Sequence, residues 1–245
     1  MDQRIVEGAS EASTGLGGST LAAIGRCVET RSRRWLVAIT LLLGLAPAAA
    51  LSAGLPPADR TYAMLSGPVQ LLMSVAVPFI GVLLAHDLLR TPPARLAPTL
   101  LAASSVAAAV GAFGAGVCAL AVAVSSPGAA ADPWNHVAII AAGSVLVQVV
   151  AQLVGVGLGL LIRGTVVACL STIVLPLGIW LVLGSVDVLR PAQAFTPYAA
   201  AQNLLSGEMS APAWTQWLVV LLLWGAGLNA LGTARLKRRH QDPHS

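Results

Sequence analysis

Six long stretches of apolar residues divide this chain, and short polar segments separate them. None of the six contains Asp, Glu, Lys or Arg, whose side chains cost about 2.5–3.5 kcal/mol each at the centre of a bilayer on insertion scales. A helix needs about 20 residues to cross the hydrocarbon core. The pattern therefore predicts an all-α membrane protein with six transmembrane helices. They cover residues 35–55, 64–86, 99–125, 137–162, 165–186 and 214–234.

The segments outside these stretches predict further features. Residues 1–18 are polar and rich in Gly, Ser and Glu, which is typical of a disordered tail. In the segment that follows, Leu21, Ile24 and Val28 recur at helical spacing and predict an amphipathic helix at the membrane interface. A plain juxtamembrane tail is the alternative. The loop at 187–213 is apolar enough to form short helical segments before the last span.

Basic residues fall almost entirely on one side of the six predicted spans. With the N-terminus inside, 12 of the 14 Lys and Arg residues face the cytoplasm, and Arg60 and Arg190 lie outside. Cytoplasmic loops are enriched in Lys and Arg, so we expect both termini in the cytoplasm and a multi-pass protein of the cytoplasmic (cell) membrane. The six-helix domain would cover residues 19–239, with a short tail at 240–245. The twelve residues are Arg4, Arg26, Arg31, Arg33, Arg34, Arg90, Arg95, Arg163, Arg235, Lys237, Arg238 and Arg239.

Composition agrees with this prediction and narrows the function. Hydrophobic residues make up 56% of the chain and charged residues 10%, against about 25% charged residues in soluble domains. The net charge of +4 comes from arginines near span ends, so we expect membrane lipid and no nucleic acid among the partners. The three cysteines, Cys27, Cys118 and Cys169, are scattered and predict neither a disulfide framework nor a metal site.

The predicted spans lack the residues that enzymes and ion-coupled carriers usually place inside the membrane. The four histidines, His86, His136, His240 and His244, lie at span ends or in the tail. Proton and ion relays usually need buried carboxylates or histidines. Lys237 is the one lysine, and no glycine-rich phosphate-binding turn precedes it. We therefore expect no enzyme activity and no cofactor, and any ATP must bind to another chain.

Three glutamines and one polar loop are the candidate functional features. Gln70 lies in the second span, and Gln148 and Gln152 share one face of the fourth. They are candidates either for a translocation path or for helix packing by hydrogen bonds worth about 0.6 kcal/mol each, and the sequence favours packing. The segment 86–95 predicts a compact loop stiffened by two prolines.

The order of these parts resembles the permeases of the ABC-2 type, the membrane subunits of ATP-binding-cassette exporters. The segment 30–35 leads into the first span, and the fourth span ends in the glycine-rich segment 155–159. A tight turn at 163–165 joins the fourth and fifth spans, as in that family. Pro197 begins a stretch similar to the family's re-entrant region, and a basic segment at 235–239 ends the chain.

The resemblance covers about residues 21–239 and implies a permease dimer, homomeric or heteromeric, with separate ATPase subunits below it. It implies export of a cargo, which the uncharged spans predict to be apolar or amphipathic. It also implies that Asp87, Arg90, Pro92 and Arg95 couple the permease to the ATPase, although the family's Gly-Thr step is missing here. The alternatives are a non-transport scaffold or assembly factor and, with less support, an ion-coupled carrier.

Overall fold

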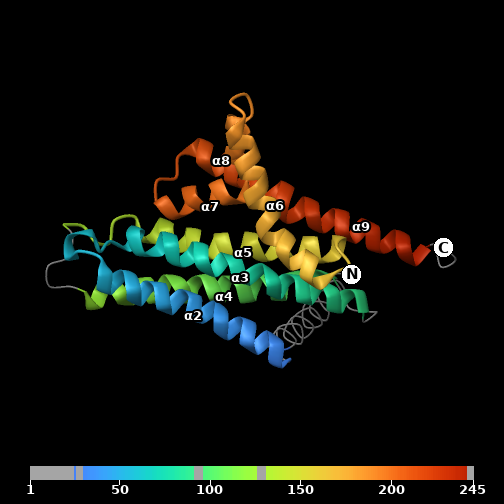
Figure 1. The fold of residues 1–245 in the computed structure, drawn as a ribbon, viewed down its shortest axis with the longest axis horizontal. Coiled ribbons are helices and arrows are strands. Elements are labelled where there is room, and N and C mark those ends of the chain that lie inside the picture. The colour runs from blue at the N-terminus through green and yellow to red at the C-terminus, as the bar shows by residue number, and fades with distance from the viewer. Residues whose placement is uncertain (1–24, 26–29, 91–95, 126–130, 242–245) are drawn as a thin grey trace, which may run out of the picture.

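The part of the chain that the computed structural model describes is helical and contains no strand. Six of its helices are long and apolar enough to cross a membrane, which confirms the predicted number (Figure 1). The predicted disordered tail and nearly all of the predicted amphipathic helix lie outside the described residues, as does the end of the C-terminal tail. The described residues are 25, 30–90, 96–125 and 131–241.

The last of the six spans is a composite of three consecutive segments, whereas each of the others is one continuous helix. The segment before it contains two short helices, η2 (Arg190–Phe195) and α7 (Pro197–Ser206), where short helical segments were predicted. A third, η1 (Pro57–Asp59), lies between the first two spans. The six spans are α2 (Arg31–Gly54), α3 (Tyr62–Arg90), α4 (Leu96–Val124), α5 (Val137–Leu161), α6 (Thr165–Ser185) and the composite of α8 (Ala211–Val220), η3 (Leu221–Gly227) and α9 (Leu228–Gln241).

The predicted loop at 86–95 is wrong at its beginning, because α3 continues as a helix to Arg90. Hydropathy ended the span at His86, where the polar residues begin. The segment from His86 to Arg90 contains no helix-breaking residue, and the next proline after it is Pro92. A helix can extend past the hydrocarbon core into the polar interface, so apolarity alone marks the end of a span too early. Asp87 is therefore a helical residue.

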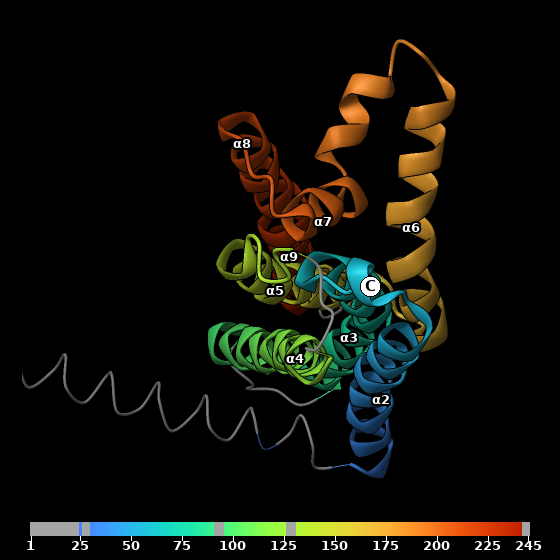
Figure 2. The same cartoon turned by 90° about the vertical axis from the view of Figure 1, so that its left-hand side faces the viewer.

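Two helices form the centre of the bundle, α3 and α5, and α2, α4 and α9 pack around them. The α6 helix differs, because it projects away from this bundle (Figures 1 and 2). Most of its apolar side chains are exposed, including Val166, Val174 and Leu181. Its far end lies beside η2 and α7. The structure thus has a bundle of α2, α3, α4, α5 and the η3 and α9 parts of the last span, and the α6 span contacts this bundle less closely.

Glycines allow the two central helices to approach closely. A Cβ atom added at Gly81 of α3 would lie 2.7 Å from the carbonyl oxygen of Gln152 in α5. One added at Gly155 of α5 would collide with the backbone of Pro78 in α3. Gly157 faces α9 instead, where a Cβ would lie 2.6 Å from that of Leu228. The glycine-rich end of α5 therefore packs against neighbouring helices on two sides, as small residues commonly do in membranes.

Candidate functional site

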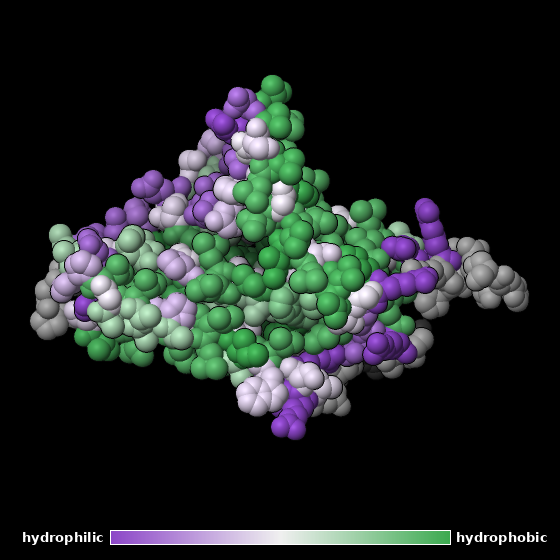
Figure 3. All heavy atoms as spheres, in the orientation of Figure 1, coloured by the Kyte–Doolittle hydropathy of each residue, from purple (hydrophilic) through white to green (hydrophobic). Residues whose placement is uncertain are grey.

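A network of polar side chains joins several helices at the end of the bundle where α2 begins and α9 ends. Figure 3 shows a hydrophobic surface across the middle of the molecule and hydrophilic residues gathered at this end and over α7 and α8. We call this network the basic-end network. It consists of Arg33, His86, Asp87 and Arg235, with the backbone carbonyls of Val82, Leu83, Leu161 and Arg163.

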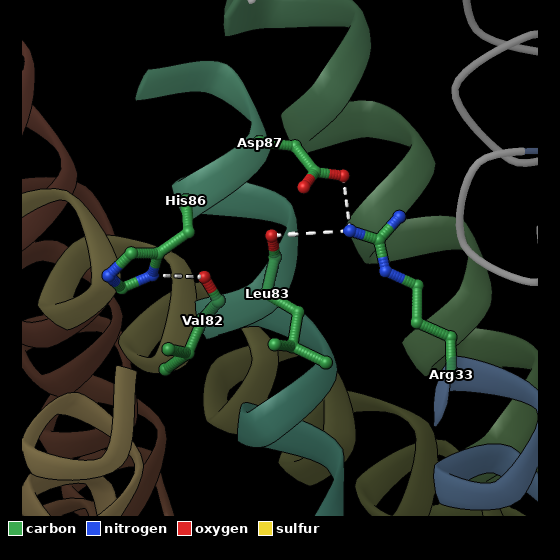
Figure 4. A network of polar contacts seen from close by, with 5 residues as sticks. All are labelled: Arg33, Val82, Leu83, His86 and Asp87. Carbon is green, nitrogen blue, oxygen red and sulfur yellow. Dashed lines mark hydrogen bonds and ion pairs between the residues drawn. The ribbon is translucent and has the colours of Figure 1, made fainter. Parts of the chain in front are cut away.

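Arg33 forms the first connection, from α2 to α3 (Figure 4). Its Nη2 forms an ion pair with Asp87 Oδ2 and donates a hydrogen bond of 3.4 Å to the carbonyl oxygen of Leu83. Leu83 and Asp87 are four residues apart, so they lie on one face of α3. The side chain of Arg33 is only 6% exposed, whereas that of Asp87 is 43% exposed. The pair is thus buried on its cationic side and open to solvent on its anionic side.

His86 forms the second connection, from α3 to the turn between α5 and α6. Its Nδ1 lies 2.9 Å from the carbonyl oxygen of Val82, one helical turn earlier, and its Nε2 lies 3.0 Å from that of Arg163. The tautomer of the ring decides which of the two nitrogens donates. The ring is 7% exposed. His86 therefore holds the end of α3 against Arg163, which lies two residues before the first residue of α6.

Arg235 forms the third connection, because its Nη1 donates to the carbonyl oxygen of Leu161 at 2.7 Å. Leu161 is the last residue of α5. Its carbonyl oxygen therefore has no N–H donor within that helix. An arginine near such a terminus also suits the helix dipole. The last span is thereby fixed to the same turn that His86 contacts. Four regions meet at this end, namely α2, α3, the α5–α6 turn and α9.

The predicted ATPase-coupling residues lie at this end as far as they are described. Asp87 is paired with Arg33 of the same chain, and it keeps enough exposure to meet another protein. Arg90 is the last residue of α3 and is exposed. Pro92 and Arg95 lie outside the described residues. The coupling role of all four stays a prediction.

The three glutamines form a second polar cluster, in the centre of the bundle. All three side chains are fully buried. Nε2 of Gln148 donates to the side-chain oxygen of Gln70 at 2.9 Å and to its backbone oxygen at 3.0 Å, and Nε2 of Gln70 donates to the carbonyl of Gly111 in α4 at 3.1 Å. With the amide of Gln152 oriented to satisfy both of its groups, its nitrogen donates to the carbonyl of Val77 and its oxygen accepts from the amide of Gly81. These contacts join α3, α4 and α5 and support the packing interpretation.

Sequence reasoning missed Asn229 of α9. Its Nδ2 donates to the carbonyl oxygens of Leu153 at 2.9 Å and Gly225 at 2.6 Å, so it connects the last span to α5. It lies just after η3, a π-helical segment whose wider backbone leaves carbonyls without the usual helical partner. Asn229 and Gln216 are the two amide residues in the predicted span 214–234, and Asn229 lies farther than Gln216 from the nearer end of that span. That signal is the same one that identified the glutamines.

No protein-family model and no curated protein matches this chain. The residues described here contain no group of three or more His, Cys, Asp or Glu side chains that could hold a metal ion. The basic-end network consists instead of connections between helices. Such an arrangement suits the transmission of movement between the helices that it joins.

Proposed function

We propose that this chain is the permease subunit of an ATP-driven exporter of the ABC-2 type, with ATP hydrolysed by a separate subunit. The observation that carries the proposal is the basic-end network, which joins four regions at the arginine-rich end. An ATPase needs a surface that transmits its movement into the membrane helices. A network that connects the ends of α2 and α3 with the α5–α6 turn supports such a role.

The direction of that transmission follows from the contacts. Arg90 ends α3 in an exposed position, next to the segment that leads to Arg95, so a partner that moves this segment displaces the end of α3. The ion pair with Arg33 carries the displacement to α2, and the contact between His86 Nε2 and the carbonyl oxygen of Arg163 carries it to the turn before α6. In this mechanism both termini are cytoplasmic, as the distribution of basic residues predicts.

A second permease subunit completes the proposed exporter. The α6 helix contacts the bundle less than the other spans do and exposes a row of Val and Leu side chains that includes Val166, Leu170 and Val174. In the proposed exporter, two such chains together form the walls of the cargo path. We propose that α6, with α2 and α3, faces the second copy or a similar chain. The uncharged spans favour an apolar or amphipathic cargo.

The first test is purification of the tagged chain from its native membranes, followed by mass spectrometry of the proteins that accompany it. We expect a soluble chain with a phosphate-binding loop at a fixed ratio to the permease. Its absence after chemical crosslinking in intact membranes would contradict the proposal and favour a scaffold or assembly factor.

The second test addresses coupling. The double variant Arg90→Glu with Arg95→Glu should reduce both the amount of copurified ATPase and its cargo-stimulated hydrolysis, while the permease is still inserted in the membrane. Arg190→Glu is the matched control, since Arg190 lies on the side predicted to be outside. Equal copurification and hydrolysis in all three proteins would exclude the segment after α3 as the docking site.

A further inference from the structure

A cavity of about 430 Å³ lies between the bundle and the projecting α6 helix. Residues of α3, α5, α6, α7 and α8 line it, and it is open on one side. Its volume falls within the range of about 300–1,000 Å³ that is usual for small-molecule sites. The described residues that line it are mostly aliphatic, and none of them is charged. The cavity belongs to one chain and requires no second subunit to form its walls.

Two helix-interior prolines give this apolar cavity hydrogen-bond acceptors. Pro78 of α3 and Pro176 of α6 both line it. A proline has no N–H, so the carbonyl four residues before it loses its helical donor. Those carbonyls belong to Ser74 and Thr172, and both residues line the same cavity. Each of the two walls therefore carries a backbone oxygen that lacks its usual N–H donor within the helix.

The hydroxyl groups of the same two residues add acceptor capacity. Oγ of Ser74 donates to the carbonyl of Leu71 at 2.7 Å, and Oγ1 of Thr172 donates to that of Cys169 at 2.7 Å. Since each hydroxyl hydrogen is used within its own helix, each oxygen has only lone pairs left to offer. The polar groups of α3 and α6 in this cavity are thus acceptors, which a ligand satisfies only by donating.

The aromatic residues restrict the ligand further. Tyr198 of α7 and Trp217 of α8 also line the cavity. Aromatic faces attract cations and also pack against apolar bodies. A carboxylate or phosphate would find no cationic partner among the described lining residues, and leaving it unpaired in an apolar site is costly. The indole N–H of Trp217 has no hydrogen-bond partner among the described residues, so the cavity also offers a donor. The chemistry favours an alcohol or amine head group, because both donate to the oxygens of Ser74 and Thr172 and a hydroxyl can also accept from this N–H.

We propose that this cavity binds an amphiphile that has an apolar body and an alcohol or amine head group, and that the head group donates to oxygens of Ser74 or Thr172. Such a molecule can come from the surrounding membrane as a lipid or from the cell as transported cargo. The binding chemistry is the same in both cases. A ligand would bind here whether or not the chain belongs to an exporter.

The test uses the full chain in phosphatidylcholine nanodiscs and a dodecyl alcohol that carries a diazirine on its alkyl chain. After photolysis, we expect saturable labelling of peptides from α3 and α6, with protection by excess dodecanol or dodecylamine. Dodecyl methyl ether, which lacks the donor, should protect about 3- to 10-fold less well, as expected for one lost hydrogen bond. Labelling that does not saturate and spreads over all lipid-facing helices would overturn the proposal.

Two proline variants test the role of the backbone oxygens. Pro176→Ala supplies the missing N–H to the carbonyl of Thr172, so it should reduce protection by dodecanol and leave protection by the methyl ether unchanged. Pro47→Ala is the control, because Pro47 lies inside α2 and does not line the cavity. Equal effects of the two variants on dodecanol would refute the assignment of the head group to this carbonyl.

The source of the natural ligand is identified by two further measurements. Extraction of the purified chain followed by mass spectrometry would reveal a bound lipid alcohol or amine if the membrane supplies it. Loss of the alkyl amine from vesicles that depends on both ATP and the ATPase subunit would identify a cargo. Either result supports the binding site, whereas saturable labelling with no preference for a donor head group contradicts it.

Discussion

The ion pair between Arg33 and Asp87 should contribute more to stability than an exposed ion pair in the same protein. Exposed pairs contribute about 0–1 kcal/mol, and breaking a fully buried pair costs about 3–5 kcal/mol. The side chain of Arg33 is 6% exposed and that of Asp87 is 43% exposed. The geometry is thus intermediate, and solvent near Asp87 screens part of the attraction. We expect a coupling energy of about 1–3 kcal/mol.

A double-mutant cycle measures that coupling. The wild type, Arg33→Ala, Asp87→Ala and the double variant are unfolded by titration with sodium dodecyl sulfate in mixed micelles, and tryptophan fluorescence reports the transition. The double variant should be less destabilised than the sum of the two single variants. Asp87→Ala should be the more harmful single change, because it removes the carboxylate from the buried guanidinium, whereas Arg33→Ala leaves a carboxylate that water can reach.

The chain contains a matched control pair. Arg190 Nη2 lies 2.8 Å from Asp187 Oδ1, but these side chains are 65% and 89% exposed. The same cycle at this pair should give less than about 1 kcal/mol. If the Arg33–Asp87 cycle gives no more than the control cycle, burial of the arginine does not strengthen the pair, and the basic-end network is not a mechanical connection between α2 and α3.

Three further predictions concern the packing of the helices and the topology of the chain. Gly155→Ala should destabilise the bundle by about 1–3 kcal/mol, since its methyl group meets the backbone of α3, whereas Gly116→Ala meets nothing within 4 Å and should be nearly neutral in the same unfolding assay. Gln148→Leu should cost about 0.6–1.7 kcal/mol through the lost interhelical hydrogen bonds, and a neutral result would show that they contribute little. Reporters fused at Ser245 and inserted at Gly128 should lie on opposite sides of the membrane, and the same sidedness at both would contradict six spans.

Helices were easier to predict from this sequence than the contacts between them. Hydropathy depends on each residue alone, and six uninterrupted apolar stretches are enough to locate six spans. The end of α3 was placed at His86 because Asp87 is charged, yet the helix continues, since its charged residue finds Arg33 on a helix 54 positions away. Arg33 lies too far from Asp87 in the sequence for any pattern of neighbouring residues to include both. The polarity of Asp87 was visible in the sequence, and the reason for its place in a helix was not.

The same distinction separates the two polar clusters. Gln148 and Gln152 stood out because amides are rare in apolar spans, and their spacing placed them on one helix face. On α3, Gln148 reaches the side-chain and backbone oxygens of Gln70, and Gln152 reaches the backbone carbonyl of Val77. The sequence cannot single out the backbone acceptors, and it does not show which helix places Gln70 beside Gln148. Arg33 went unnoticed within a run of arginines, because only the packing of α2 on α3 makes it buried while Arg31 and Arg34 are exposed.

The π-helical segment η3 sets the rotational register of the end of the chain. Each residue in an α-helix turns the chain by about 100°. A π-helical turn contains one residue more than a turn closed by α-helical hydrogen bonds. Removing one residue from Leu221–Gly227 would restore a regular helix and rotate all of α9 by about that angle relative to α8. Asn229 would then turn away from Leu153, and Arg235 from Leu161. The position of the C-terminal arginines around their helix thus depends on a single extra residue about two turns before them.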